Sequence, residues 1–574
     1  MKKFMTKKAF TLVELLVVIA IVAILAVAGV VGYMAFTAKA NQSNDTTLVA
    51  QLNSYIEAAG ISEAINTTTD ARNILIQDGI DLATLKLTAK DYKPAFDIAS
   101  KKFYKVKGTD AEDFEGNNVD LFVFVANSDE AATFAAAGYS VYLQAGYNGT
   151  EITLNGTSVD TGENNTVTTV TYNNAGSGKT VLIRTSGDQT KLTINAPNDD
   201  INYYGFAQEL TVKAVKASSL HIYGATNELA VESGHVQVEA TGIVFDVVQI
   251  GAESTGAGAT ITNSGYVAAA TMTKNTEAVR ETAKAAVTGK TVGGDYDIGT
   301  LAQLEAFRDA VNAGNNFAGI TVKLTSNITL RDGWRPIGEG SRKVGASNQI
   351  ALGTTTFFRG TFDGNNKTIS NLNNKGFTPT TSRLVKDTYN GVEKDSYSYG
   401  LFALIGNGAV IKDLVLTNVD IDTSRYASAV GDSIGAAVGF ANDSATISNI
   451  TVSGSVAGYD AVGGIIGRIY AKGAATITGC TNNASITIAA EGTTKGAGII
   501  GLASDAGTYT ITNNTNNGSI TGGGQGTRQL NAGIATFGQK VVTESRYVVS
   551  NNKVGATEAE VVNANALYLY GVFA

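Results

Sequence analysis

The sequence predicts a mainly β protein joined to one long N-terminal helix, and three observations predict it. The apolar stretch from Phe10 to Phe36 is longer than the roughly 20 residues that cross a bilayer as a helix. Behind it, short alternating apolar runs are separated by Gly, Asn, Asp and Ser, which is typical of strands and tight turns. In the last third, glycine-centred motifs recur in steps of 29 to 35 residues, a period typical of solenoids.

The N-terminal stretch differs from an ordinary secretory signal. Secretory signals have their small-residue cleavage site after the apolar run, whereas here small Ala9 comes before it. Four lysines precede Ala9, so the positive-inside rule places the N-terminus in the cytoplasm and everything after Phe36 outside. Glu14 lies near the start of the apolar run, where a bare carboxylate is costly and normally has a specific partner.

The segment K-K-A-F-T-L-V-E-L-L resembles the leader junction of type IV pilins and pseudopilins, over about residues 1–60. The resemblance implies that a prepilin peptidase cuts between Ala9 and Phe10 and methylates the new amine of Phe10. It also implies that Glu14 neutralises this amine when the helix packs against other pilin subunits, because an unpaired buried charge costs about 3–5 kcal/mol. The alternative is a signal anchor that stays in the cytoplasmic membrane, with Glu14 at the lipid interface.

Composition limits the class of protein. At 574 residues the chain is too long for one domain, and 44% hydrophobic residues argue against disorder. The net charge is −8 and no basic block follows the leader, so nucleic acid is not expected as a partner. Cys480 is the single cysteine, so no internal disulfide can form, and we expect a buried, unreactive thiol there.

After the helix, the pattern predicts a small α+β head, as the pilin resemblance implies. Short helices are expected over 70–80 and 130–137, with strands over 92–98, 103–107 and 121–125. From residue 149 many short strands follow one another, which favours a β-helix and leaves a sandwich as the rival. Residues 271–298 are expected to form a linker or connecting helix.

The last region begins with an amphipathic helix from Thr300 to Ala313, with Thr300 as its N-cap. The segments WRPIG and FFRGTFDGNN follow, an order that resembles the first coils of bacterial surface proteins with a pectin-lyase-like right-handed β-helix. The later glycine motifs resemble the Gly-rich repeats written G-L-U-G, and they start at Gly400, Gly435, Gly464, Gly498 and Gly533. Stacked repeats share one continuous core, and the Asn pairs between them are expected to stack in ladders.

These observations divide the chain into six predicted segments. They are a leader (1–9), a transmembrane pilin-type helix (10–60), the α+β head (61–148), a β-rich domain (149–270), a linker (271–298) and a β-helix with Gly-rich repeats (299–574).

Catalytic residues are not expected, although right-handed β-helices also include polysaccharide lyases and hydrolases. The carboxylates nearest the first coil are Asp332, Glu339 and Asp363, and no acid recurs along one face as paired-acid chemistry requires. Trp334 and Arg335 are possible glycan contacts, with Trp334 as a core residue the alternative. No His, Cys and acid cluster has ligand spacing, so His221 and His235 are expected in structural positions and no metal or cofactor is predicted.

The function predicted from the sequence is therefore structural and adhesive. We expect a type IV pilin-like subunit in a minor or tip position, located in the cytoplasmic membrane before assembly and in an extracellular pilus afterwards. Its expected partners are prepilin peptidase, other pilin subunits, the membrane, and a glycan or protein ligand. The alternatives are a membrane-anchored polysaccharide-acting enzyme, or a pseudopilin of a secretion or DNA-uptake system.

Overall fold

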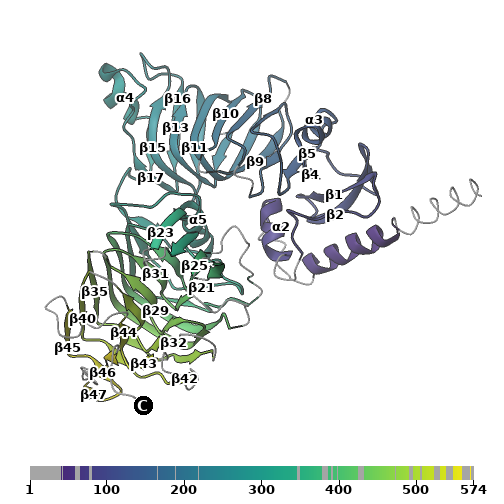
Figure 1. Cartoon of the computed structure of the whole chain (residues 1–574). Helices are drawn as coiled ribbons and strands as arrows, with labels where there is room; N and C mark the ends of the chain where they lie inside the picture. Colours follow the sequence, from purple (N-terminus) through teal and green to yellow (C-terminus); the bar gives the residue numbers. More distant parts are fainter. Residues whose placement is uncertain are drawn as a thin grey trace, which may run out of the picture.

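A computed structural model describes most of the chain beyond the N-terminal stretch (Figure 1). The described residues are 41, 43–57, 65–75, 80–163, 166–176, 178–187, 189–217, 219–344, 350–375, 377, 385–389, 392–396, 398–424, 432–471, 473–489, 495–504, 507–522, 530–537, 547–558 and 569–570. Within these residues, no helix is both long enough and apolar enough to span a membrane. The predicted membrane stretch from Phe10 to Phe36 lies outside them.

The head joins an N-terminal helix, residues 43–57, to a small sheet. Its strands pair antiparallel, β2 with β1 and β3, and β1 also with β4. Phe96, Phe103, Phe122 and Phe124 of these strands are buried in one aromatic cluster because alternate side chains of neighbouring strands point to the same face. The other head elements and the strand bounds are α2 (Thr68–Leu75), β1 (Tyr92–Asp97), β2 (Lys102–Lys107), β3 (Asp110–Glu112), β4 (Leu121–Val125) and α3 (Ser128–Ala136).

A first solenoid follows without a break in the hydrogen-bonded sheet. Head strand β4 pairs in parallel with β5, and β5 pairs in parallel with β7. From there the strands form two parallel ladders, and each coil of the chain adds one strand to each ladder. This parallel pairing distinguishes the region from a sandwich of antiparallel strands. Its strands are β5 (Ser140–Leu143), β6 (Glu151–Leu154), β7 (Val159–Asp160), β8 (Thr169–Asn173), β9 (Thr180–Ser186), β10 (Lys191–Ala196), β11 (Asp200–Val215), β12 (Leu220–Ile222), β13 (Ala225–Val231), β14 (Gly234–Val238), β15 (Ile243–Ile250), β16 (Ala259–Asn263), β17 (Tyr266–Ala269) and β18 (Val287–Gly289).

The predicted linker is more ordered than a bare connection. It contains two short helical segments, η3 (Glu277–Val279) and α4 (Arg280–Lys284). It also contains β18, which pairs with β16 and so belongs to the first solenoid. The sequence did not indicate this strand because Val287 is its single large apolar residue.

The second solenoid begins with β19 (Tyr296–Ile298) and α5 (Leu301–Asn312). Thr300 is the N-cap of α5, and its hydroxyl accepts a hydrogen bond from the amide of Gln303, as predicted. Parallel ladders then stack coil on coil, with shared apolar columns such as Ile411, Ile447, Ile477 and Ile511 inside. The main strands are β20 (Thr321–Leu324), β24 (Thr361–Ser370), β29 (Ala409–Asp422), β32 (Ala445–Gly458), β35 (Ala474–Thr478), β40 (Thr508–Thr512) and β45 (Tyr547–Ser550), with the second sheet formed by β28 (Phe402–Ile405), β31 (Val438–Asn442), β34 (Ile466–Tyr470), β39 (Ile500–Ser504) and β44 (Ala535–Phe537).

The recurring glycines lie where neighbouring coils touch. A Cβ built on Gly435 would come 2.4 Å from the Gly467 nitrogen, and one on Gly464 would come 2.3 Å from the Gly498 oxygen. Real Cβ atoms do not approach backbone atoms so closely, so these positions require glycine. The repeat seen in the sequence is therefore a packing requirement between stacked coils.

Candidate functional site

The predicted processing and assembly residues lie outside the described part of the chain. Ala9, Phe10 and Glu14 belong to residues 1–40, so their roles stay predictions from the sequence. What the structure does describe is how the helix that follows them is attached to the rest of the protein.

The helix of residues 43–57 is fixed to the head by polar contacts of Asp45, Asn53 and Thr46, the last of which accepts a hydrogen bond from Lys105 at 2.9 Å. The buried carboxylate of Asp45 accepts hydrogen bonds from the amides of Thr88 at 2.7 Å and Ala89 at 2.9 Å. The side chain of Asn53 accepts from the amide of Phe103 at 2.6 Å and donates to its carbonyl at 3.1 Å. Leu52 and Ile56 lie in the aromatic cluster of the head, so the helix has one defined orientation on the head.

The head is joined to the first solenoid through Asp160 of β7. This carboxylate is fully buried and accepts hydrogen bonds from the hydroxyls of Thr68 and Thr69, which begin α2. It also accepts from the amide of Thr69 at 3.2 Å and from Arg184 at 3.2 Å. A negative charge is favourable at a helix N-terminus, so a solenoid residue caps a helix of the head.

The two solenoids meet along one column of side chains, which we call the seam. Phe206, Ala225, Ile243 and Tyr266 follow one another in register on successive coils of the first solenoid. They share one buried cluster with the start of the second solenoid, where the rings of Tyr266 and Tyr296 lie 5.0 Å apart. The seam therefore joins the second solenoid to a corner of the first.

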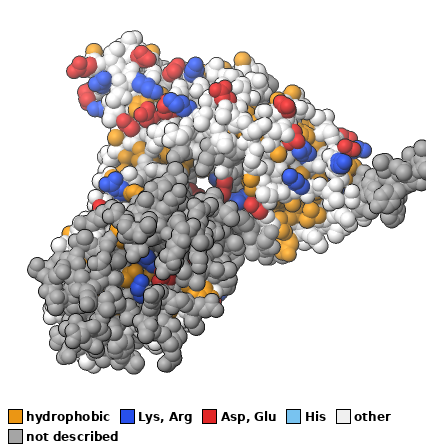
Figure 2. Space-filling view, viewed as in Figure 1, with side chains coloured by type: hydrophobic (Ala, Val, Ile, Leu, Met, Phe, Trp, Pro, Cys, Tyr) orange, Lys and Arg blue, Asp and Glu red, His pale blue; other side chains and the backbone are white. Residues whose placement is uncertain are grey.

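Charged side chains gather at the end of the seam nearest the head, in the hollow where the three parts meet (Figure 2). Arg72 of α2 is buried and pairs with Asp81 at 2.6 Å and with Glu163 at 2.9 Å. Arg335 of the second solenoid lies 3.8 Å from the same Glu163 oxygen. One carboxylate of the first solenoid is thus shared by arginines of the head and of the second solenoid.

This arrangement argues against the predicted sugar contact at Trp334. Its side chain is 3% exposed, and the indole nitrogen donates to the carbonyl of Leu401 at 3.2 Å. The guanidinium of Arg308 lies 5.0 Å from the ring centroid, over the ring. The ring is therefore not available to a sugar at the surface, and Arg335 beside it faces Glu163.

The carboxylates considered for catalysis have local partners. Asp332 accepts from the amides of Asn373 at 2.8 Å and Asn371 at 3.1 Å, and these hydrogen bonds lower its pKa. Asp363 pairs with Lys412 at 2.6 Å and accepts from the amide nitrogen of Asn365. Glu339 begins β22 (Glu339–Val344), and its side chain is outside the described set.

Each histidine has a neighbouring hydrogen-bond partner, and the cysteine is buried. His221 lies 2.7 Å from Glu239, and His235 lies 2.7 Å from the hydroxyl of Thr260. Over the described residues, no group of three or more His, Cys, Asp and Glu side chains could bind a metal ion. Cys480 is fully buried, and burial raises the pKa of its thiol to about 12.

Stacked asparagines line the inside of the second solenoid at two corners. The amide of Asn482 donates to Asn516 at 2.8 Å, and that of Asn514 donates to Asn552 at 3.0 Å. All four side chains are buried, with exposures of 2% or less. The sequence predicted ladders, with Asn482-Asn483 and Asn513-Asn514 at equivalent turns. The ladders exist, but the equivalence is wrong: Asn482 stacks with Asn516, and Asn514 stacks with Asn552 at a different corner.

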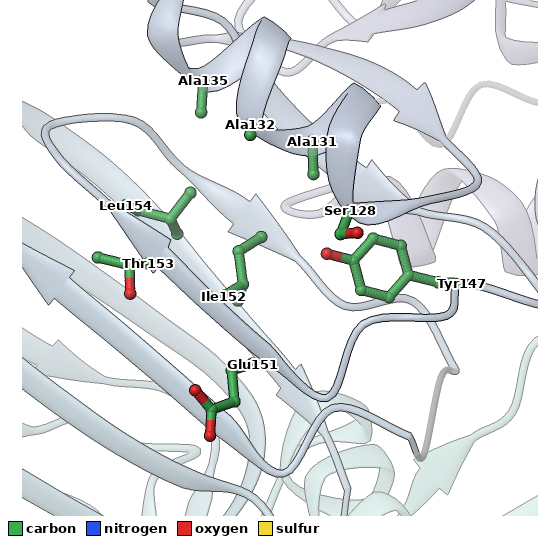
Figure 3. A pocket seen from close by; sticks show the side chains of 9 residues that line it. All are labelled: Ser128, Ala131, Ala132, Ala135, Tyr147, Glu151, Ile152, Thr153 and Leu154. Carbon is green, nitrogen blue, oxygen red and sulfur yellow. The ribbon is translucent and has the colours of Figure 1, made fainter.

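A cavity of about 120 Å³ lies between α3 and β6 (Figure 3). The alanines of α3, Ala131, Ala132 and Ala135, face Ile152 and Leu154 of β6. Because β6 pairs with β8 on one side, α3 covers its other edge at the start of the ladder. The lining also includes Tyr147 and Glu151, and in Figure 3 the carboxylate of Glu151 points away from Tyr147, so we interpret the cavity as a gap in this cap.

Comparison with known proteins assigns the start of the chain. Residues 4–30 match the prokaryotic N-terminal methylation motif, so the chain carries a prepilin-like leader. A stretch of 222 residues is 27% identical to halomucin from Haloquadratum walsbyi (strain DSM 16790 / HBSQ001), covering 37% of this chain. The chain spans about 2% of the length of that curated relative. No solved structure matches.

Proposed function

We propose that this chain is a type IV pilin-like subunit that displays its solenoids at the cell surface for attachment to a glycan or protein ligand. The observation that carries the proposal is that the N-terminal helix, the head and the first solenoid are joined directly to one another. The methylation motif at residues 4–30 leads to a helix fixed on the head, and the sheet of the head continues into the first solenoid. A subunit fixed by its helix would therefore carry the solenoids in a defined orientation.

In this proposal prepilin peptidase cuts between Ala9 and Phe10 and methylates Phe10. Before the cut, the protein is in the cytoplasmic membrane with the solenoids outside, as the leader lysines require. During assembly Glu14 neutralises the new amine among the packed helices of other pilin subunits.

The bulk of the solenoids supports a minor or tip position. In Figure 1 the helix of residues 43–57 lies at one side of the molecule, and both solenoids lie beyond its C-terminal end. In a filament shaft this volume would collide with the next subunit, whereas at the tip it is free of neighbours. The local partners of Asp332 and Asp363 support a role without catalysis.

Intact-mass and N-terminal analysis of the protein from its host tests the proposal. The expected chain begins at methylated Phe10 and is recovered in sheared surface filaments. Glu14→Ala is expected to remove the protein from that fraction, whereas the control Glu57→Ala, at the exposed end of the described helix, leaves it there. A chain that begins at Met1 and stays with the membrane would contradict the proposal.

A further inference from the structure

One outer face of the first solenoid bears an unusual group of polar and aromatic side chains. On the ladder β11, β12 and β14, Asn202, His221 and Gln237 occupy equivalent positions on successive coils. Beside this column, Tyr204, Tyr223 and Glu239 follow in the same order. The rings of Tyr204 and Tyr223 stack at 5.0 Å with an interplanar angle of 9°. We call these six residues the aromatic face.

Three polar groups of the aromatic face have no protein partner. Over the described residues, the hydroxyls of Tyr204 and Tyr223 and the amide of Asn202 make no hydrogen bond. All three side chains are half-buried, and burial is the main cause that raises the pKa of both tyrosines. None of these atoms is among the solvent-excluded polar atoms without a partner, so a ligand can reach them and replace the water that they contact.

The aromatic face has the head on one side and the start of the second solenoid on another. Tyr204 packs against the aromatic cluster of the head, and the charge of Asp70 on α2 acts on its hydroxyl. On another side, Gln303 of α5 donates to the carbonyl of Ala240, next to Glu239. In Figure 1 both α2 and α5 lie below the strands of the first solenoid. Residues of α2 and α5 therefore lie beside this face.

The charge of the surroundings selects among ligands. The aromatic face contains one carboxylate, Glu239, and no lysine or arginine. Asp70 lies close enough to raise the pKa of Tyr204, and the nearby Arg184 is already paired with Asp160. Lys101, the other cation near Asp70, donates to the carbonyl of Ile65. An anionic ligand would be repelled by Glu239 and Asp70, whereas a neutral ligand would not.

We propose that the aromatic face binds a neutral glycan chain, which would supply many closely spaced hydroxyls to these unpaired groups. This inference rests on the proposed attachment function and assigns it a site and a ligand class. The stacked tyrosines, with ring centroids 5.0 Å apart, present two hydroxyls from neighbouring coils. The amide of Asn202 adds donors and an acceptor, and Gln237 adds its side-chain oxygen, since its nitrogen donates to Val238 and Ser264.

Calorimetric titration of the full chain in detergent tests the site. The probes are the neutral sugars cellohexaose, mannohexaose and N-acetylchitohexaose, with hexagalacturonate as the anionic comparison. At least one neutral sugar is expected to bind, and Tyr223→Ala and Asn202→Ala are each expected to weaken binding about tenfold or more. Tyr223→Phe keeps the ring and removes the hydroxyl, so it remains informative even where Tyr223→Ala fails to fold.

The matched control is Tyr104→Phe in the head. Tyr104 is also half-buried, stacks edge-on with Phe114 at 5.1 Å, and makes no hydrogen bond through its hydroxyl to a described residue. The control is expected to bind like the unchanged protein. The inference would be overturned if no neutral sugar bound, or if only hexagalacturonate bound. It would also be overturned if Tyr223→Phe, Asn202→Ala and the control bound with equal affinity. Filament recovery is measured separately, so the pilin proposal can fail or succeed independently.

Discussion

Replacing Asn514 by alanine should destabilise the second solenoid selectively. Its side-chain oxygen accepts from the amide of Cys480 at 3.0 Å, and its nitrogen donates to the carbonyl of Ile477 and to Asn552, each at 3.0 Å. The side chain is fully buried, so water cannot replace these partners. Alanine would leave the amide of Cys480 unpaired in the core and remove one hydrogen bond to the carbonyl of Ile477.

The expected loss follows from the amide of Cys480. An unpaired buried group costs about 1–3 kcal/mol, so the free energy of unfolding should fall by about 1–3 kcal/mol. The matched control is Asn517→Ala, three residues away. Asn517 is exposed and its amide makes one side-chain hydrogen bond, to Asn483, so its replacement should cost about 0.5 kcal/mol or less.

The single tryptophan provides the assay. Trp334 is buried in the second solenoid, so its fluorescence during denaturant unfolding reports on that part of the chain. The midpoint should move to lower denaturant in Asn514→Ala and stay near the original value in Asn517→Ala. Equal midpoints for the two variants would refute the argument that the buried asparagine side chains provide hydrogen bonds to backbone groups at the corners of the coil.

Three further outcomes are expected. Gly435→Ala should prevent folding of the second solenoid, as measured by circular dichroism. Gly176→Ala, where a Cβ meets one side-chain atom at 3.1 Å, should be tolerated. A folded Gly435→Ala protein would contradict the close contact between coils. Asp160→Asn should lower the free energy of unfolding by about 3–5 kcal/mol, because the positive charge of Arg184 loses its buried partner. It should also speed hydrogen exchange in α2, whose first turn Asp160 caps. Unchanged exchange in α2 would argue against the cap. Cys480, whose pKa is raised to about 12, should react with a thiol reagent at pH 8 only after denaturation, and rapid native labelling would show that the thiol is accessible.

Local patterns in the sequence predicted the elements well where a single physical rule dominates. The α5 helix has an apolar stripe and an N-cap threonine, so its start at Leu301 could be predicted from adjacent residues. The glycine period predicted stacked coils, because only glycine fits where backbones of neighbouring coils touch. The strands over 149–270 left solenoid and sandwich open, since short alternating runs do not encode whether neighbouring strands run parallel.

Features that depend on distant parts of the chain could not be predicted. Asp160 lies in a two-residue strand, and nothing near it in the sequence indicates that it caps a helix 90 residues earlier. Trp334 was considered for a glycan because an aromatic beside an arginine suits sugar stacking, but Arg308 of α5 covers its ring. The aromatic face was missed because Tyr204, Tyr223 and Glu239 are far apart in sequence and adjacent only through the ladder.

Because the ladder runs unbroken from β4 through β5 into the first solenoid, the reach of the protein can change only in steps of whole coils. Each added coil would lengthen a ladder by one strand spacing, about 4.8 Å, while both ends of the solenoid keep their own contacts. Variants of different reach could therefore arise by gain or loss of whole coils, with no change in the helix, the head or the way they enter a filament.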